Sequence, residues 1–197
     1  GWEAQPSLSA DGKELFFTSV RIGSRDNDIY YSQRQEDGSW SSAIPFDIIN
    51  TVGKDKSPFF HQDGKTLYFV SSNSNERKGL GGLDIFYIRK QGDNWSEPKN
   101  IGFPINSEND ELGLFISTDG KTAYYASERK DSYGGLDLYS FELNPSIRPF
   151  ETRWVTGKVS DKKTGIGIPA TLELTDLQNG QIISRVKTDS LGNYLLT

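Results

Sequence analysis

The chain has 197 residues, 34% of them hydrophobic and 12% aromatic, which is enough for one large or two small domains with a packed core. The net charge of −5 and the lack of a basic patch argue against a nucleic-acid partner. The lack of cysteine excludes disulfides and thiolate zinc sites, and no apolar run reaches the ~18 residues of a direct membrane span.

One pattern occurs three times, as an Asp-Gly-Lys turn followed at once by an aromatic strand. The turns begin at Asp11, Asp63 and Asp119, which are 52 and 56 residues apart. Asp-Gly between apolar runs indicates a hairpin, because Gly accepts a positive φ. The strands that follow are near-continuous apolar runs, which indicates that both of their faces are covered: residues 14–19, 66–71 and 122–127. A period near 50 residues with such strands predicts β-propeller blades.

Two further strands complete the predicted blade. The third strand begins with Asp in every repeat, at Asp28, Asp84 and Asp137. The fourth carries Trp in the first two repeats, at residues 38–43 and 93–98, and each leads to a similar bridge that ends in Asn-Thr or Asn-Ser. The third repeat lacks this strand. Because propellers typically have about 4–8 blades, we expect residues 1–143 to be the C-terminal part of a larger ring, with blades upstream of residue 1 and an upstream segment supplying the missing strand.

The pattern changes after residue 143. Residues 144–153 contain two Pro and are predicted to be a linker. Strands are expected at residues 154–159, 170–175 and 181–187, with an Asn-Gly turn at 179–180 and a last strand that stops at Thr197. We therefore predict an all-β chain, a partial propeller of three four-stranded blades followed by a small β-sandwich over residues 154–197 that is truncated at its C-terminus.

The repeats over about residues 4–143 resemble the PD40 repeats of TolB-type, WD40-like β-propellers. The third copy departs from them, with Glu111-Leu112 where the others have Pro6 and Pro58. Residues 155–161, 165–169 and 188–194 resemble the carboxypeptidase regulatory-like, transthyretin-like β-sandwich. This order is similar to that of OmpA-family envelope proteins of Gram-negative bacteria, some of which are outer-membrane lipoproteins tied to type IX secretion and gliding.

The resemblance implies a non-enzymatic scaffold in the periplasm, associated with the outer membrane. Its partners would be envelope or secretion-machinery proteins. Peptidoglycan would be bound by a domain downstream of Thr197. No cofactor is implied.

The residues that could carry chemistry have a structural alternative in each case. His61 is the only His, too few for a zinc site, and we expect it at a turn or strand end rather than in a Ser-His-Asp triad. The repeated Asp residues could include a glycosidase pair, but their equivalent positions favour Asx-type turns that accept hydrogen bonds from the preceding loop. Residues 24–28 offer several oxygens for calcium but lack the spacing of a known calcium loop. The Gly-rich residues 79–82 lack the Lys-Ser/Thr of a P-loop, and we expect a flexible loop there.

The variable loops all join a second to a third strand, so they share one face of a propeller. We expect this face, if it is more than solvated loops, to bind a partner. The candidate residues are Arg25, Arg77, Lys78, Arg129, Lys130 and Tyr133. The rival hypothesis is a hydrolase, either a propeller glycosidase or the propeller of a prolyl-oligopeptidase-like enzyme, whose α/β-hydrolase domain is not seen in this sequence.

Overall fold

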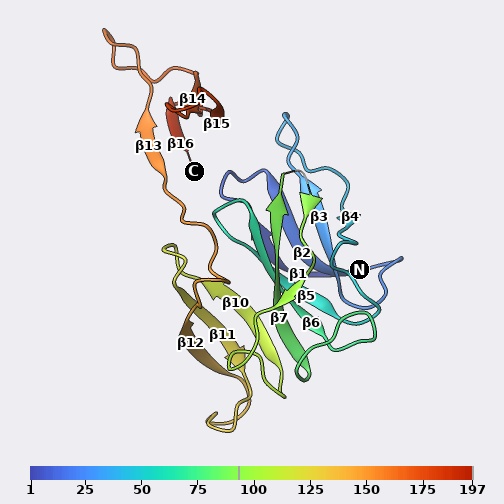
Figure 1. Ribbon diagram of the computed structural model, residues 1–197. Helices are drawn as coiled ribbons and strands as arrows, with labels where there is room; N and C mark the ends of the chain where they lie inside the picture. The colour runs from blue at the N-terminus through green and yellow to red at the C-terminus, as the bar shows by residue number, and fades with distance from the viewer. Residues whose placement is uncertain (93, 197) are drawn as a thin grey trace. The chain divides into compact units, whose positions relative to one another are not determined.

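All regular structure that the computed structural model describes, over residues 1–92 and 94–196, is β-strand (Figure 1). Asp93, in the predicted fourth strand of the second repeat, and Thr197, the predicted truncated end, lie outside the described residues. No helix in the described ranges could cross a membrane. The chain divides into two units, Gly1–Glu151 and Thr152–Thr197. The all-β prediction is confirmed.

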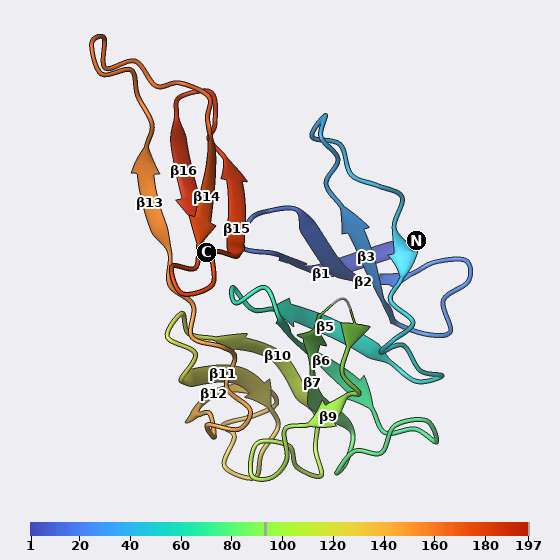
Figure 2. The same cartoon turned by 45° about the horizontal axis from the view of Figure 1, so that its top comes forward.

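Unit 1 contains three antiparallel sheets, one for each repeat. The first blade has the order β1 (Trp2–Leu8), β2 (Glu14–Val20), β3 (Asp28–Gln33), β4 (Ile44–Pro45). The second has β5 (Asp55–Phe60), β6 (Thr66–Ser72) and β7 (Leu83–Gln91), with β8 (Asn94–Trp95) and β9 (Lys99–Asn100) both paired to β7. The third has β10 (Glu111–Ile116), β11 (Thr122–Ser127) and β12 (Asp137–Glu142). The second blade lies between the other two (Figures 1 and 2).

The Trp strand predicted for the first repeat begins too early, whereas the one predicted for the second repeat contains the strand β8. Trp40 forms only an isolated bridge with Arg34, and the strand that pairs with β3 is β4. In the second blade, Trp95 belongs to β8, which pairs with the C-terminal end of β7. The chain then forms β9, which pairs with the middle of β7. The Ser that follows each Trp interrupts the main-chain pairing. The hydroxyls of Ser41 and Ser96 accept hydrogen bonds from main-chain N–H groups of the third strand, at 2.9 and 3.0 Å.

Unit 2 contains two two-stranded antiparallel sheets. One pairs β13 (Val155–Lys158) with β16 (Asn193–Leu196), and the other pairs β14 (Thr171–Thr175) with β15 (Ile182–Lys187). Gly180 has a φ of 73°, as the predicted Asn-Gly turn requires. The four predicted strands are confirmed to within one or two residues in the described part of this unit.

The first strand of every blade carries the same β-bulge. The pairing register shifts within β1, β5 and β10, and Gln5, Ser57 and Gly113 adopt φ values of 55°, 51° and 59° at equivalent positions. This register aligns Leu114, not Glu111-Leu112, with Pro6 and Pro58. The third copy therefore still departs from the other two, with Leu in place of Pro, but the departure lies at Leu114 and not at Glu111-Leu112, because the bulge sets the alignment of the repeats.

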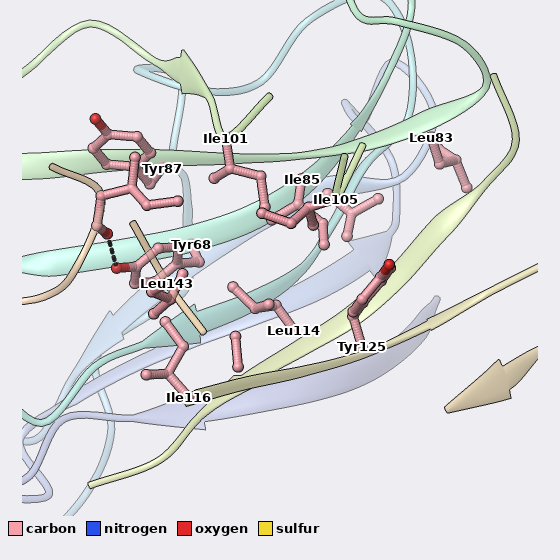
Figure 3. Close-up of a cluster of buried hydrophobic side chains, with 13 residues drawn as sticks. Tyr68, Leu83, Ile85, Tyr87, Ile101, Ile105, Leu114, Ile116, Tyr125 and Leu143 are labelled. Carbon is pink, nitrogen blue, oxygen red and sulfur yellow. Dashed lines mark hydrogen bonds between the residues drawn. The ribbon is translucent and has the colours of Figure 1, made fainter. Parts of the chain in front are cut away.

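Two apolar clusters join the blades. The first packs Phe16 and Ile29 of the first blade against side chains of β6 and β7. The second packs Tyr68 and Ile85 of the second blade against the third (Figure 3). Six of the seven residues of β6 are consequently buried, which agrees with its continuous apolar sequence, whereas β11 is buried only at alternate positions.

An asparagine side chain fixes each junction between blades. The Asn50 amide accepts a hydrogen bond from Ile29 N and donates one to Ile29 O, at 2.8 and 2.9 Å. The Asn106 amide does the same with Ile85 N and O, at 2.9 and 2.8 Å. The amide thus satisfies the outward main-chain groups of the third strand, as a paired strand would.

A carboxylate follows at the start of the next blade. Asp55 accepts hydrogen bonds from the main chain and hydroxyl of Thr51, at 2.6 and 2.8 Å. Glu111 accepts the equivalent pair from Ser107, at 3.0 and 2.6 Å. The bridge segments that carry Asn50-Thr51 and Asn106-Ser107 were predicted only as similar sequences. Through these hydrogen bonds they join consecutive blades, and we call this arrangement the lock.

Residues 144–150 fold back onto the blades of unit 1. Ile147 is buried in the second cluster, and its carbonyl accepts a hydrogen bond from Tyr68 Oη at 2.7 Å, drawn as a dashed line in Figure 3. Unit 1 extends to Glu151, so most of the stretch 144–153 that the sequence predicts as a linker belongs to this unit.

Replacing Asn106 by Ala should leave the buried Ile85 N–H without its side-chain acceptor, whereas Ile85 O keeps the hydrogen bond from Ile101 N at 3.2 Å. One unpaired buried group costs about 1–3 kcal/mol, so we expect the free energy of unfolding, measured by urea titration, to fall by at least about 1 kcal/mol. Asn75 is exposed in the β6–β7 loop, and Asn75→Ala should change the free energy by less than about 0.5 kcal/mol. Equal effects of the two substitutions would contradict the lock.

Candidate functional site

The loops between second and third strands lie at the same strand ends as the connections between blades, because successive strands are antiparallel. We call this end of unit 1 the loop face. A cavity of about 370 Å³ opens on it. Its lining comes from the β2–β3 and β6–β7 loops and from both blade connections: Asp26, Gly53, Lys54, Ser72, Asn73, Gly81, Gly82, Leu83 and Asp110.

The cavity lining is polar and carries both signs of charge. Asp110 Oδ1 accepts a hydrogen bond from Leu83 N at 2.9 Å, which fixes this carboxylate at the wall. Asp26 and Lys54 supply a second carboxylate and an ammonium. Nearby, burial and the neighbouring Lys54 lower the pKa of Lys56, an effect that Asp110 and Asp26 oppose. Such a lining suits a polar or charged group of a ligand rather than an apolar one.

The glycines at the cavity wall permit close packing. A Cβ on Gly81 would clash with the main chain of Glu108, and one on Gly82 would clash with the Asp110 carboxylate. The β6–β7 loop is therefore packed against the blade connection, and the expectation of a flexible loop at residues 79–82 is wrong. These glycines allow close packing within the protein, whereas the glycines of a P-loop allow the main chain to bind phosphate.

Four of the six predicted partner-binding residues are exposed on the loop face. Arg25 and Lys130 form solvent-exposed ion pairs with Glu76 and Glu108, at 3.5 and 3.6 Å. Lys78 and Tyr133 are also exposed. None of the six lines the cavity. Because exposed ion pairs contribute little to stability, these four side chains remain available to a partner.

The Arg77 side chain is only 10% exposed and forms its contacts within unit 1. Its Nη1 donates to Asp55 Oδ1 at 2.7 Å, to Ile49 O at 2.8 Å and to Ser71 Oγ at 3.0 Å. The guanidinium also lies over the ring of Phe69, 5.0 Å from its centroid. Arg77 therefore ties the connection from the first blade to the first two strands of the second.

Arg129 is half-buried and serves its own blade in a similar way. It donates to Tyr125 Oη at 2.7 Å and lies over the Tyr139 ring, 5.4 Å from its centroid. Arg21 stacks likewise on Tyr30 in the first blade, at 4.5 Å. An Arg that covers aromatic rings is thus part of each blade, a pattern visible in sequence only as an Arg after each second strand.

The repeated Asp residues accept hydrogen bonds from the loops before them, as predicted. Asp28 Oδ2 accepts one from Arg25 N at 3.0 Å. Asp84 and Asp137 accept them from the main-chain N–H groups of Leu80 and Tyr133. These bonds close each loop onto its third strand, so the three carboxylates do not converge on a shared site.

His61 lies in the turn between β5 and β6, where it was expected. Its Nδ1 accepts a hydrogen bond from Asp63 N at 3.1 Å, and its ring is buried. Burial opposes ionisation of the adjacent Asp63, but hydrogen bonds from Thr66 and from the main chain outweigh it and lower the pKa of Asp63. Over residues 1–92 and 94–196, no group of three or more His, Asp or Glu is arranged to hold a metal.

No protein-family model matches the sequence, and no curated protein is similar enough to match. Among solved structures, an α-L-arabinofuranosidase from Lactobacillus brevis is similar, with a TM-score of 0.50 and 17% identity over 86% of this chain and 59% of that chain. An acylaminoacyl peptidase from Pyrococcus horikoshii has a TM-score of 0.38 and 14% identity over 95% of this chain and 25% of that chain. The first likeness shows a β-propeller fold, so the partial propeller is confirmed.

Replacing Arg77 by Ala should destabilise the protein strongly, because it leaves the Asp55 carboxylate buried without its cation. Breaking a buried pair costs about 3–5 kcal/mol, and we expect a loss of that size in urea unfolding. Lys78 is its exposed neighbour, and Lys78→Ala should change the free energy by less than about 0.5 kcal/mol. A small effect of Arg77→Ala would show that this Arg is not structural.

Proposed function

We propose that unit 1 is a non-enzymatic scaffold whose loop face binds a partner protein. The observation that supports this most is a division of roles among the residues. The recurring Asp and Arg side chains form bonds within their blades, whereas Arg25, Lys78, Lys130 and Tyr133 are exposed in the loops of the face on which the mixed-charge cavity opens. A rigid frame with variable charged loops is the usual arrangement of a recognition surface.

In the cell, the proposed scaffold lies in the periplasm and is associated with the outer membrane. It would hold envelope or secretion-machinery proteins, and a downstream domain would bind peptidoglycan. This part of the proposal rests on the sequence resemblance to OmpA-family envelope proteins.

The loop face can be tested with charge-reversal variants in pull-downs from envelope extract. Lys54→Glu and Lys78→Glu change the cavity and the loop beside it. Lys121→Glu is the control, since Lys121 is exposed in the hairpin turn at the opposite strand ends. We expect the wild type and the control to recover the same envelope protein, and each loop-face variant to recover at least about fivefold less, because opposed charges set partner recognition. No recovery, or equal recovery by all variants, would count against a loop-face scaffold.

A glycosidase is the second candidate, and the specific observation for it is the presence of two carboxylates, Asp26 and Asp110, in one cavity. Most glycosidases cleave with two carboxylates on either side of the bond, and the Lactobacillus brevis neighbour is an α-L-arabinofuranosidase.

The scaffold proposal predicts only background hydrolysis of aryl arabinofuranosides by the wild type. A wild-type activity that falls at least about 100-fold in Asp26→Asn and Asp110→Asn would establish the hydrolase instead. Asp47→Asn, at an exposed position outside the cavity, is the matched control.

A further inference from the structure

The charges that line the loop-face cavity differ from other charges of the same face. Arg25 and Lys130, which lie outside the cavity, each pair with a carboxylate, at 3.5 and 3.6 Å. Asp26, Lys54 and Asp110 line the cavity, and none of them forms an ion pair with a described residue. The cavity therefore holds charges of both signs that do not neutralise one another.

Two of these charges occupy equivalent positions in successive blades. Lys54 directly precedes Asp55, and Asp110 directly precedes Glu111, which are the carboxylates of the two locks. The main chain of Lys54 is fixed further, because its N–H donates to Ser72 Oγ and its carbonyl accepts from Ser72 N, both at 2.8 Å. The locks thus hold an ammonium on one blade and a carboxylate on the next, which is a preorganised pair of opposite poles.

Each pole has hydrogen-bonding capacity left for a ligand. Asp110 Oδ1 accepts a hydrogen bond from Leu83 N at 2.9 Å, and Asp26 Oδ1 accepts one from the amide of Asn27 at 3.3 Å. The Oδ2 atoms of both carboxylates accept no hydrogen bond from the part of the chain that the structure describes. A carboxylate accepts hydrogen bonds at both oxygens, and the Lys54 ammonium offers three donors.

A second lysine lies among the same charges. Lys54 lies just before β5 and Lys56 within it, so both project from the strand on the side opposite to the Asp55 carboxylate. Burial and the Lys54 ammonium lower the pKa of Lys56, whereas the carboxylates of Asp110 and Asp26 raise it. A ligand carboxylate at Lys54 would therefore relieve a repulsion between two ammonium groups.

We propose that the cavity binds a small zwitterion of amino-acid or dipeptide size, with its ammonium at Asp26 and Asp110 and its carboxylate at Lys54. The cavity volume of about 370 Å³ is near the lower end of small-molecule sites, which span about 300–1,000 Å³. Leu83 at the wall offers an apolar contact to a small side chain of the ligand. The inference goes beyond the partner-protein proposal, because it concerns a small molecule in the cavity alone.

The two charges of the ligand can be removed one at a time. L-alanyl-L-alanine is titrated into the ¹⁵N-labelled 197-residue protein and followed by NMR, beside its N-acetyl form, its amide and free L-alanine. We expect saturable shifts of the N–H signals of Gly81 and Gly82, which line the cavity, and none at Gly12 and Gly64 in the hairpin turns of the opposite strand ends. The acetylated and amidated forms should bind at least about fivefold more weakly, since each lacks one charge pair.

Protein variants assign each charge to its partner. Lys54→Gln should weaken binding of the dipeptide at least about fivefold and leave binding of its amide unchanged, because the amide has no carboxylate to pair. Asp110→Asn should do the same for the dipeptide and leave the N-acetyl form unchanged. Both side chains are exposed, and Asn keeps an acceptor for Leu83 N, so folding is retained. Asp47→Asn, exposed and outside the cavity, is the matched control.

Three results would overturn the proposal: no shift of the cavity signals at millimolar dipeptide or alanine, equal binding of the blocked and unblocked dipeptides, or full binding by both cavity variants. Binding of alanine as tight as that of the dipeptide would support a ligand of single amino-acid size. The test uses the purified protein without a partner, so recovery of a partner in pull-downs without zwitterion binding would overturn this inference and leave the loop-face scaffold standing.

Discussion

Unit 1 depends on one type of bidentate contact. At each junction, the side-chain amide of one Asn forms hydrogen bonds with both the N–H and the C=O of a residue in the preceding blade. This contact fixes how far one sheet is shifted against the next and so which apolar side chains meet. Phe16 and Ile29 reach the second blade, and Tyr68 and Ile85 reach the third, only in that register. The adjoining Thr or Ser passes the constraint to the carboxylate that starts the next first strand.

The junctions combine polar and apolar interactions with different roles. Burial of the aromatic clusters supplies most of the favourable free energy, but apolar contact has little directional preference. The buried carboxylates define the geometry at a cost in desolvation. Burial raises the pKa of Glu111, which hydroxyl groups of Ser107 and Ser127 stabilise as an anion, whereas Asp55 has Arg77 as a partner. Burial raises the pKa of Asp55 too, so both junctions hold a buried acid, and only the first has an ion-pair partner among the described residues.

Local signals in the sequence were sufficient for most of the fold. The roles of the Asp-Gly turns, the aromatic strands and the repeated Asp were predictable, because each depends on residues nearby in the sequence. The failures involve contacts between distant segments. The burial of Arg77 depends on Asp55 and Ile49, the glycines at 81–82 depend on Glu108 and Asp110, and the cavity combines two loops with two connections. The Asn at each junction was visible as a repeat, but its partner lies 21 residues away across the blade.

The Asn contact also bears on how such a protein evolves. Because the amide bonds main-chain N–H and C=O groups, it imposes no demand on the side chain that it recognises. A duplicated blade that carries its own connection can follow any other blade without a matched substitution in its neighbour at this contact. Blade number can therefore change by whole-unit gain or loss, while the loops, which take no part in this contact, diverge independently.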